Sequence, residues 1–137
     1  MTRWMLVLAS LYGFLGVAFG AFGAHALKEK VPPERLERLE LAVRYAFFHV
    51  AALLAVAWLA SACGGELFVT IAGWAFGLGV LLFSGSLVVL ALTGNRRWGA
   101  VTPFGGVLLL VGWLALAGAG WTIAATGEFS TALDSAC

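Results

Sequence analysis

The sequence predicts an all-α membrane protein: an up-down bundle of four transmembrane helices with an amphipathic lead-in to the second helix. Hydrophobic residues make up 62% of the 137 residues and charged residues only 11%, against about 25% charged in ordinary soluble domains. The charged side chains are also clustered along the chain. They leave four stretches without Asp, Glu, Lys or Arg, at residues 4–27, 45–65, 67–95 and 98–127.

Each uncharged stretch is long enough to cross a bilayer, which takes about 20 residues, since the shortest holds 21. None carries the polar stripe that every helix of a soluble bundle needs. The composition therefore excludes a soluble domain, a disordered chain and a nucleic-acid-binding protein. A chain of this length forms one domain. We expect one transmembrane domain over residues 1–137, with helices at about 4–26, 33–62, 67–92 and 103–125 and a tail at 126–137.

The first expected helix, residues 4–26, has glycines spaced three or four residues apart, and the third, residues 67–92, begins with a similar pair. Lipid tails are as apolar as the helices, so close backbone approach at small residues drives helix association in a bilayer. We interpret these glycines as packing positions rather than as the lining of a pore. They are Gly13, Gly16, Gly20, Gly23, Gly73 and Gly77.

The second expected helix, residues 33–62, begins at a proline and carries most of the charge. Pro33 suits the first helical position, where its missing N–H costs nothing. Residues 34–44 are rich in charge but place Leu36, Leu39 and Val43 on one face. This amphipathic lead-in either lies on the membrane surface or extends the second helix beyond it.

The fourth expected helix starts near Pro103, with Thr102 in front of it as the N-cap. All three links between the expected helices are short, so consecutive helices run antiparallel. The first and third links hold seven Lys and Arg residues, whereas the other side holds only Arg3. The positive-inside rule then places these two links in the cytoplasm and both termini outside.

Six polar residues lie within or beside the expected spans, on the side of the first link: His25, Tyr45, His49, Ser84, Ser86 and Thr102. Ionisable residues at membrane depth often mark function, and histidine titrates near neutral pH. Three roles are open for the histidines: helix locks that bond to backbone carbonyls, a proton or ligand site, or the beginning of a metal site. A closed zinc site needs four ligands, so we predict no metal and no cofactor.

Catalytic motifs are missing from the sequence. We expect no buried acidic residue, and the sequence has no G-x-S-x-G elbow, no phosphate-binding loop and no H-E-x-x-H motif. A pair of Ser84 and His49 would lack an acidic partner. We therefore expect that the protein is not an enzyme.

Four motifs in order resemble the small bacterial YgdD/YwdK-type membrane proteins, a domain-of-unknown-function family. They are residues 20–25 (GAFGAH), Tyr45 with Phe48-His49, residues 83–87 (FSGSL), and Thr102-Pro103 with Gly105-Gly106. The resemblance covers roughly residues 8–120. It implies a multi-pass protein of the bacterial inner membrane with four helices, and it supplies no activity.

Two functions follow from these features. The first is a structural or accessory bundle, embedded in the lipid bilayer, that self-associates or joins a larger membrane complex. Its basis is the abundance of small residues and the scarcity of polar ones. The alternative is a small transporter or ligand-binding module with a half-depth polar pocket at His25 and His49. A continuous polar path is not expected, because the opposite half of the bundle offers only Thr70 and Thr122.

Overall fold

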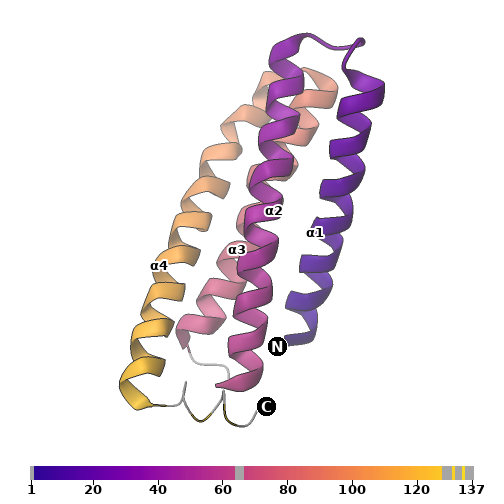
Figure 1. Cartoon of the computed structure of the whole chain (residues 1–137). Coiled ribbons are helices and arrows are strands. Elements are labelled where there is room, and N and C mark those ends of the chain that lie inside the picture. The colour runs from indigo at the N-terminus through magenta and orange to yellow at the C-terminus, as the bar shows by residue number, and fades with distance from the viewer. Residues whose placement is uncertain (1, 64–66, 128–130, 132–133, 135–137) are drawn as a thin grey trace.

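The computed structural model of the chain is a bundle of four long helices (Figure 1). It describes residues 2–63, 67–127, 131 and 134. The helices are α1 (Thr2–Phe22), α2 (Pro33–Ala62), α3 (Leu67–Thr93) and α4 (Thr102–Thr126), and each is long and apolar enough to cross a membrane. Consecutive helices run antiparallel, so the α1–α2 and α3–α4 links lie at one end and the N-terminus at the other (Figure 1). The predicted fold class is confirmed.

The amphipathic lead-in is part of α2 and not a separate surface helix. Pro32 has an extended backbone, as a residue before proline prefers, and Pro33 is the first residue of the helix. The 30 residues of α2 span about 45 Å, which exceeds the ~30 Å of hydrocarbon by several turns. The charged residues 34–44 therefore extend α2 beyond the membrane.

Two helix ends differ from the sequence prediction. The final residues of the first span form a π-helical turn, η1 (Gly23–Leu27), rather than continuing the α-helix. Thr102 is the first residue of α4 and not its N-cap, a position that Val101 occupies without a capping side chain. The Thr102 hydroxyl bonds instead to Ser86 (Oγ1···Oγ 2.8 Å) and to the Trp98 carbonyl, within the turn η2 (Arg96–Ala100).

Helix α3 forms the centre of the bundle and has the most buried residues of the four. Helix α4 packs along one side of it and α2 along another, while α1 packs mainly on α2. The core contains large side chains from every helix: Met5, Leu53, Val56, Val69, Phe76, Val80, Leu109 and Ile123. The outward faces of α1 and α4 remain apolar and exposed, as lipid contact requires.

Arginine 35 links the lead-in of α2 to the end of α3. Its guanidinium donates from Nε to the Ala91 carbonyl (2.6 Å) and from Nη2 to the Leu92 carbonyl. The last carbonyls of a helix have no partner inside it and carry the negative end of the helix dipole. Arg35 therefore caps α3, which is followed by Gly94 with its positive φ of 72°.

Candidate functional site

The two predicted site histidines lie in different surroundings. His25 is exposed in the π-helical turn after α1, whereas His49 is buried in α2 with 5% of its surface accessible. Gly23 faces Leu36 and Leu39 across the α1–α2 contact, so His25 lies near that level of α2. His49 is ten residues beyond Leu39, about 15 Å along the helix. The structure therefore does not form a site shared by both histidines.

The physical reason is the length of α2. The lead-in is continuous with the membrane-spanning part of α2. His49 lies sixteen residues after Pro33, which is about 24 Å along the helix axis. It therefore reaches the middle of the bundle, while His25 stays at the end of α1.

Both ring nitrogens of His49 are hydrogen-bonded. Nδ1 lies 2.7 Å from the Tyr45 carbonyl oxygen, one turn back in α2, and the Trp113 indole Nε1 of α4 lies 3.1 Å from Nε2. A carbonyl can only accept and an indole N–H can only donate. These partners select the neutral tautomer with its proton on Nδ1, so the imidazole connects α2 to α4.

Aromatic rings surround this imidazole. Its ring centroid lies 6.1 Å from that of Tyr45, 5.6 Å from Phe76 and 5.9 Å from Trp113. Phe76 and Trp113 also meet edge to face at 5.3 Å, a geometry that aromatic rings favour. The group formed by Tyr45, His49, Phe76 and Trp113, hereafter the His49 cluster, ties α2, α3 and α4 together.

The predicted hydroxyl residues serve other helix pairs. Ser84 of α3 donates to the Ala42 carbonyl of α2 (2.8 Å), and Ser86 of α3 bonds to Thr102 of α4. In the part of the chain that the structure describes, every buried side-chain nitrogen or oxygen has a hydrogen-bond partner. The six predicted site residues are thus distributed over separate contacts rather than gathered in one pocket.

Three residues that the sequence analysis passed over have a role in this arrangement. Trp113 supplies the donor to His49, Tyr12 of α1 donates to the Gly77 carbonyl of α3 (2.6 Å), and Arg35 caps α3. The sequence held a signal for two of them, Trp113 and Tyr12. An indole or a phenol in the middle of a span, away from the interfacial belt where Trp and Tyr usually lie, needs a partner inside the bundle.

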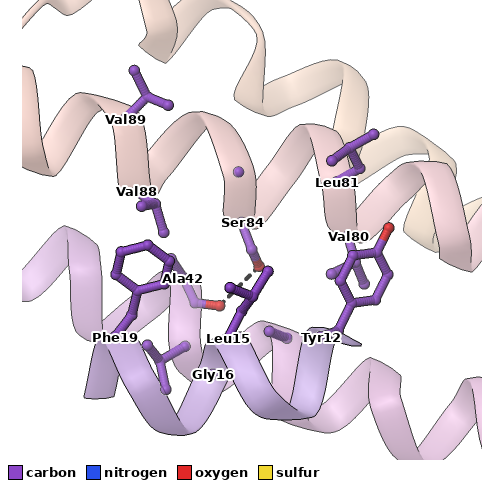
Figure 2. Close-up of a pocket in the computed structure, with 13 residues that line it drawn as sticks. Tyr12, Leu15, Gly16, Phe19, Ala42, Val80, Leu81, Ser84, Val88 and Val89 are labelled. Atoms are coloured by element: carbon purple, nitrogen blue, oxygen red, sulfur yellow. Dashed lines mark hydrogen bonds between the residues drawn. The ribbon is translucent and has the colours of Figure 1, made fainter. Parts of the chain in front are cut away.

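The lining of the cavity between α1 and α3 is almost entirely apolar. It has a volume of about 230 Å³ and lies between α1 and α3 with α2 as its floor. Its walls include Leu15, Phe19, Val80 and Val88, and Ser84 points toward Ala42 at its base (Figure 2). His25 and His49 do not line it. Across residues 2–63 and 67–127, no three His, Cys, Asp or Glu side chains group closely enough to hold a metal ion.

Comparison with known proteins places similar sequences in bacterial membranes. Residues 19–106 match the model of a protein family described as "Protein of unknown function (DUF423)". The chain is 40% identical over 111 residues to the UPF0382 membrane protein YwdK of Bacillus subtilis, and the matched region covers 81% of this chain and 90% of the relative. It is 40% identical over 119 residues to the UPF0382 inner membrane protein YgdD of Escherichia coli, covering 86% and 90%. No solved structure matches the chain.

Proposed function

Because this chain belongs to the DUF423 family of membrane proteins of unknown function, we propose that it is a structural or accessory protein of the bacterial inner membrane. In this role it self-associates or joins a larger membrane complex and catalyses no reaction of its own. The observation that carries the proposal is the use of both His49 nitrogens by Tyr45 and Trp113. His49, the buried ionisable residue that most suggested a functional site, therefore serves to hold α2 and α4 together.

The transporter alternative receives less support. It needs a polar pocket or path that connects His25 and His49, but these residues lie at different depths and neither lines the cavity between α1 and α3. The imidazole can take up a second proton only by giving up the Trp113 bond, because Nε2 would then carry a hydrogen that faces another N–H. A proton relay would have to break this connection between α2 and α4 in every cycle.

The outward faces of α1 and α4 are the surfaces that such a role would use. Both helices are mostly exposed along their spans, and Phe14 of α1 and Leu114 of α4 are 70% and 74% exposed. In a bilayer these faces contact either lipid or another transmembrane helix. A photoreactive amino acid at each position distinguishes the two contacts.

The test uses native-level expression of two differently tagged copies, with benzoylphenylalanine at Phe14 or Leu114 and, as a control outside the membrane, at Glu37. We expect ultraviolet light to give a discrete protein adduct at Phe14 or Leu114, containing the second copy or a membrane partner, and no such adduct at Glu37. Adducts with lipid alone at both membrane positions, together with a monomer in native lipid discs, would contradict the proposed function.

We further propose that the α1–α2 and α3–α4 links face the cytoplasm, since seven Lys and Arg residues lie in or beside them against one at the opposite end. Cys63 lies at the end opposite the links, and Cys137 lies outside the described residues. A membrane-impermeant thiol reagent should label the native cysteines in intact cells. In a variant with both cysteines changed to Ser, Lys30→Cys should react only after lysis. The reverse pattern would invert the orientation.

A further inference from the structure

The cavity between α1 and α3 opens because α1 changes neighbours along its length. Near the N-terminus it packs on α3, where the Trp4 and Trp74 rings stack at 4.6 Å and the Tyr12 hydroxyl bonds to Gly77. Beyond Tyr12 its glycines face α2 instead, with Gly16 against Phe47 and Gly20 against Val43. Helix α1 therefore leaves α3, and the space between them becomes a groove with α2 as its floor (Figure 2).

The chemistry of this groove matches hydrocarbon and not water. Its two polar side chains are already paired, because Tyr12 donates to Gly77 and Ser84 donates to Ala42. A buried water needs two to four polar partners, whereas an apolar cavity of about 150 Å³ binds benzene. A larger apolar space of about 230 Å³, open along a membrane-spanning helix pair, fits a segment of an acyl chain.

Positive charge lies at the end of the groove nearest the links. Arg35 is two turns before the floor residue Ala42 in α2, and it bonds to Ala91 and Leu92, about one turn beyond the lining residue Val88 in α3. These two bonds use two of the five N–H donors of a guanidinium. The links and the lead-in together carry seven Lys and Arg residues against four Glu, so this end attracts an anionic headgroup.

We propose that the groove binds one acyl chain of an anionic phospholipid from the leaflet next to the α1–α2 link, with the headgroup phosphate against Arg35. The groove supplies the contact with the chain, and the guanidinium supplies a charged hydrogen-bonding group that suits phosphate. A neighbouring α-helix is about 10–12 Å across, so it would lie over the mouth rather than fill the space. This proposal does not depend on the accessory role.

Glycine 85 offers a substitution that fills the groove without disturbing the fold. It lines the groove, and a Cβ added to it meets no atom within 4 Å. Gly120 of α4 is a matched control, because its added Cβ also meets nothing within 4 Å and it lies away from the groove. Gly85→Leu should occupy the space of the acyl chain, whereas Gly120→Leu should only meet bulk lipid.

Native mass spectrometry of the purified full-length chain, titrated with phosphatidylglycerol or phosphatidylethanolamine, measures the binding. We expect one tightly bound phosphatidylglycerol per chain. Gly85→Leu should weaken binding of both lipids by about tenfold or more, because the loss of even two buried methylene contacts has that effect. Gly120→Leu should bind like the wild type. Equal binding by both variants would overturn the proposal, as would a dimer that only Gly85→Leu dissociates, since the groove would then hold a second copy.

The headgroup contact is tested separately with Arg35→Gln, whose amide can still donate to the end of α3, and with Arg38→Gln as a charge-matched control. Arg35→Gln should weaken the binding of both lipids, because each carries a phosphate. It should also abolish the preference for phosphatidylglycerol, whose negative charge is not offset by an ammonium group. Arg38→Gln should keep most of the preference. Loss of the preference in both variants to the same extent would show general attraction to the basic end and would overturn the assignment to Arg35.

Discussion

The α3–α4 and α1–α3 contacts use similar residues to opposite effect. Along α4, glycines lie against phenylalanines of α3: Gly105 against the backbone and Cβ of Phe83, Gly112 against the Phe76 ring and Gly118 against the Phe68 ring. The spacing of six or seven residues on one helix matches that of seven or eight on its antiparallel partner. Backbone or ring atoms of α3 fill the gap at each of these glycines, so the contact is closed at all three.

The α1–α3 contact is closed only near the N-terminus, where Gly73 and Gly77 of α3 receive Met5 and Leu8 of α1. Farther along, the glycines of α1 turn to α2, and Gly85 of α3 faces open space. This difference shows that the spacing of glycines identifies a helix surface that can pack closely. It does not identify which helix packs there. The large side chain opposite the glycine decides whether the contact closes.

The largest expected effect comes from breaking the closed contact at Gly105. An added Cβ would collide with the backbone and Cβ of Phe83, which cannot retreat as a flexible side chain can. Gly105→Leu should lower the free energy of unfolding by about 3 kcal/mol or more, the upper range for overpacking. Thermal melting in mild detergent measures this loss.

Gly106 provides the matched control for that experiment. Its added Cβ would lie 3.7 Å from the Phe83 ring, an ordinary van der Waals distance. Gly106→Leu should melt close to the wild type. Equal melting of both variants would show that α4 does not approach α3 as closely as the glycines allow.

A smaller loss of stability is expected when the hydrogen bond between His49 of α2 and Trp113 of α4 is removed. His49→Leu leaves the Trp113 N–H without its acceptor and should cost about 1–3 kcal/mol. His49→Gln retains a donor and an acceptor and should keep most of the stability. Detergent melting of both variants, combined with Trp113→Phe in a double-mutant cycle, measures the coupling. A coupling near zero would show that the two side chains act independently.

The fold could be predicted from the sequence because membrane helices leave a simple signature. Four long uncharged stretches and short links determine an up-down bundle almost without reference to side-chain packing. The π-helical turn at Gly23–Leu27 was missed because composition does not distinguish a wider turn from an α-helical one. The capping role of Thr102 was wrongly predicted because Ser86, sixteen residues earlier in the sequence, takes up its hydroxyl.

The site was harder to predict, because it depends on how the helices rotate about their axes. His49 was recognised as a polar residue inside a span, but its separation from His25 depended on treating the lead-in as part of α2. Its partner Trp113 lies 64 residues away, and nothing local to either residue indicates the pairing. The cavity at Ser84 could likewise not be predicted from the sequence, since it results from the departure of α1 from α3.

The smallest effects on stability are expected at the glycines of α1, the helix that departs from α3. An added Cβ at Gly16 would lie 3.1 Å from the Phe47 ring, one at Gly20 would lie 3.6 Å from Val43, and one at Gly13 meets nothing within 4 Å. Within this chain, Gly13 therefore has no close neighbour on its side-chain face, unlike the other two glycines. Gly16→Leu should cost about 1 kcal/mol, because Phe47 is 43% exposed and can swing toward lipid.

Gly20→Leu should cost less than Gly16→Leu, and Gly13→Leu should leave the melting temperature unchanged. The graded series follows from α1 resting on movable side chains of α2, whereas Gly105 of α4 rests on backbone. Melting of the three variants in one detergent gives the order directly. A loss at Gly13 as large as at Gly16 would contradict it and would place another helix, from a second copy or a partner, against the outer face of α1.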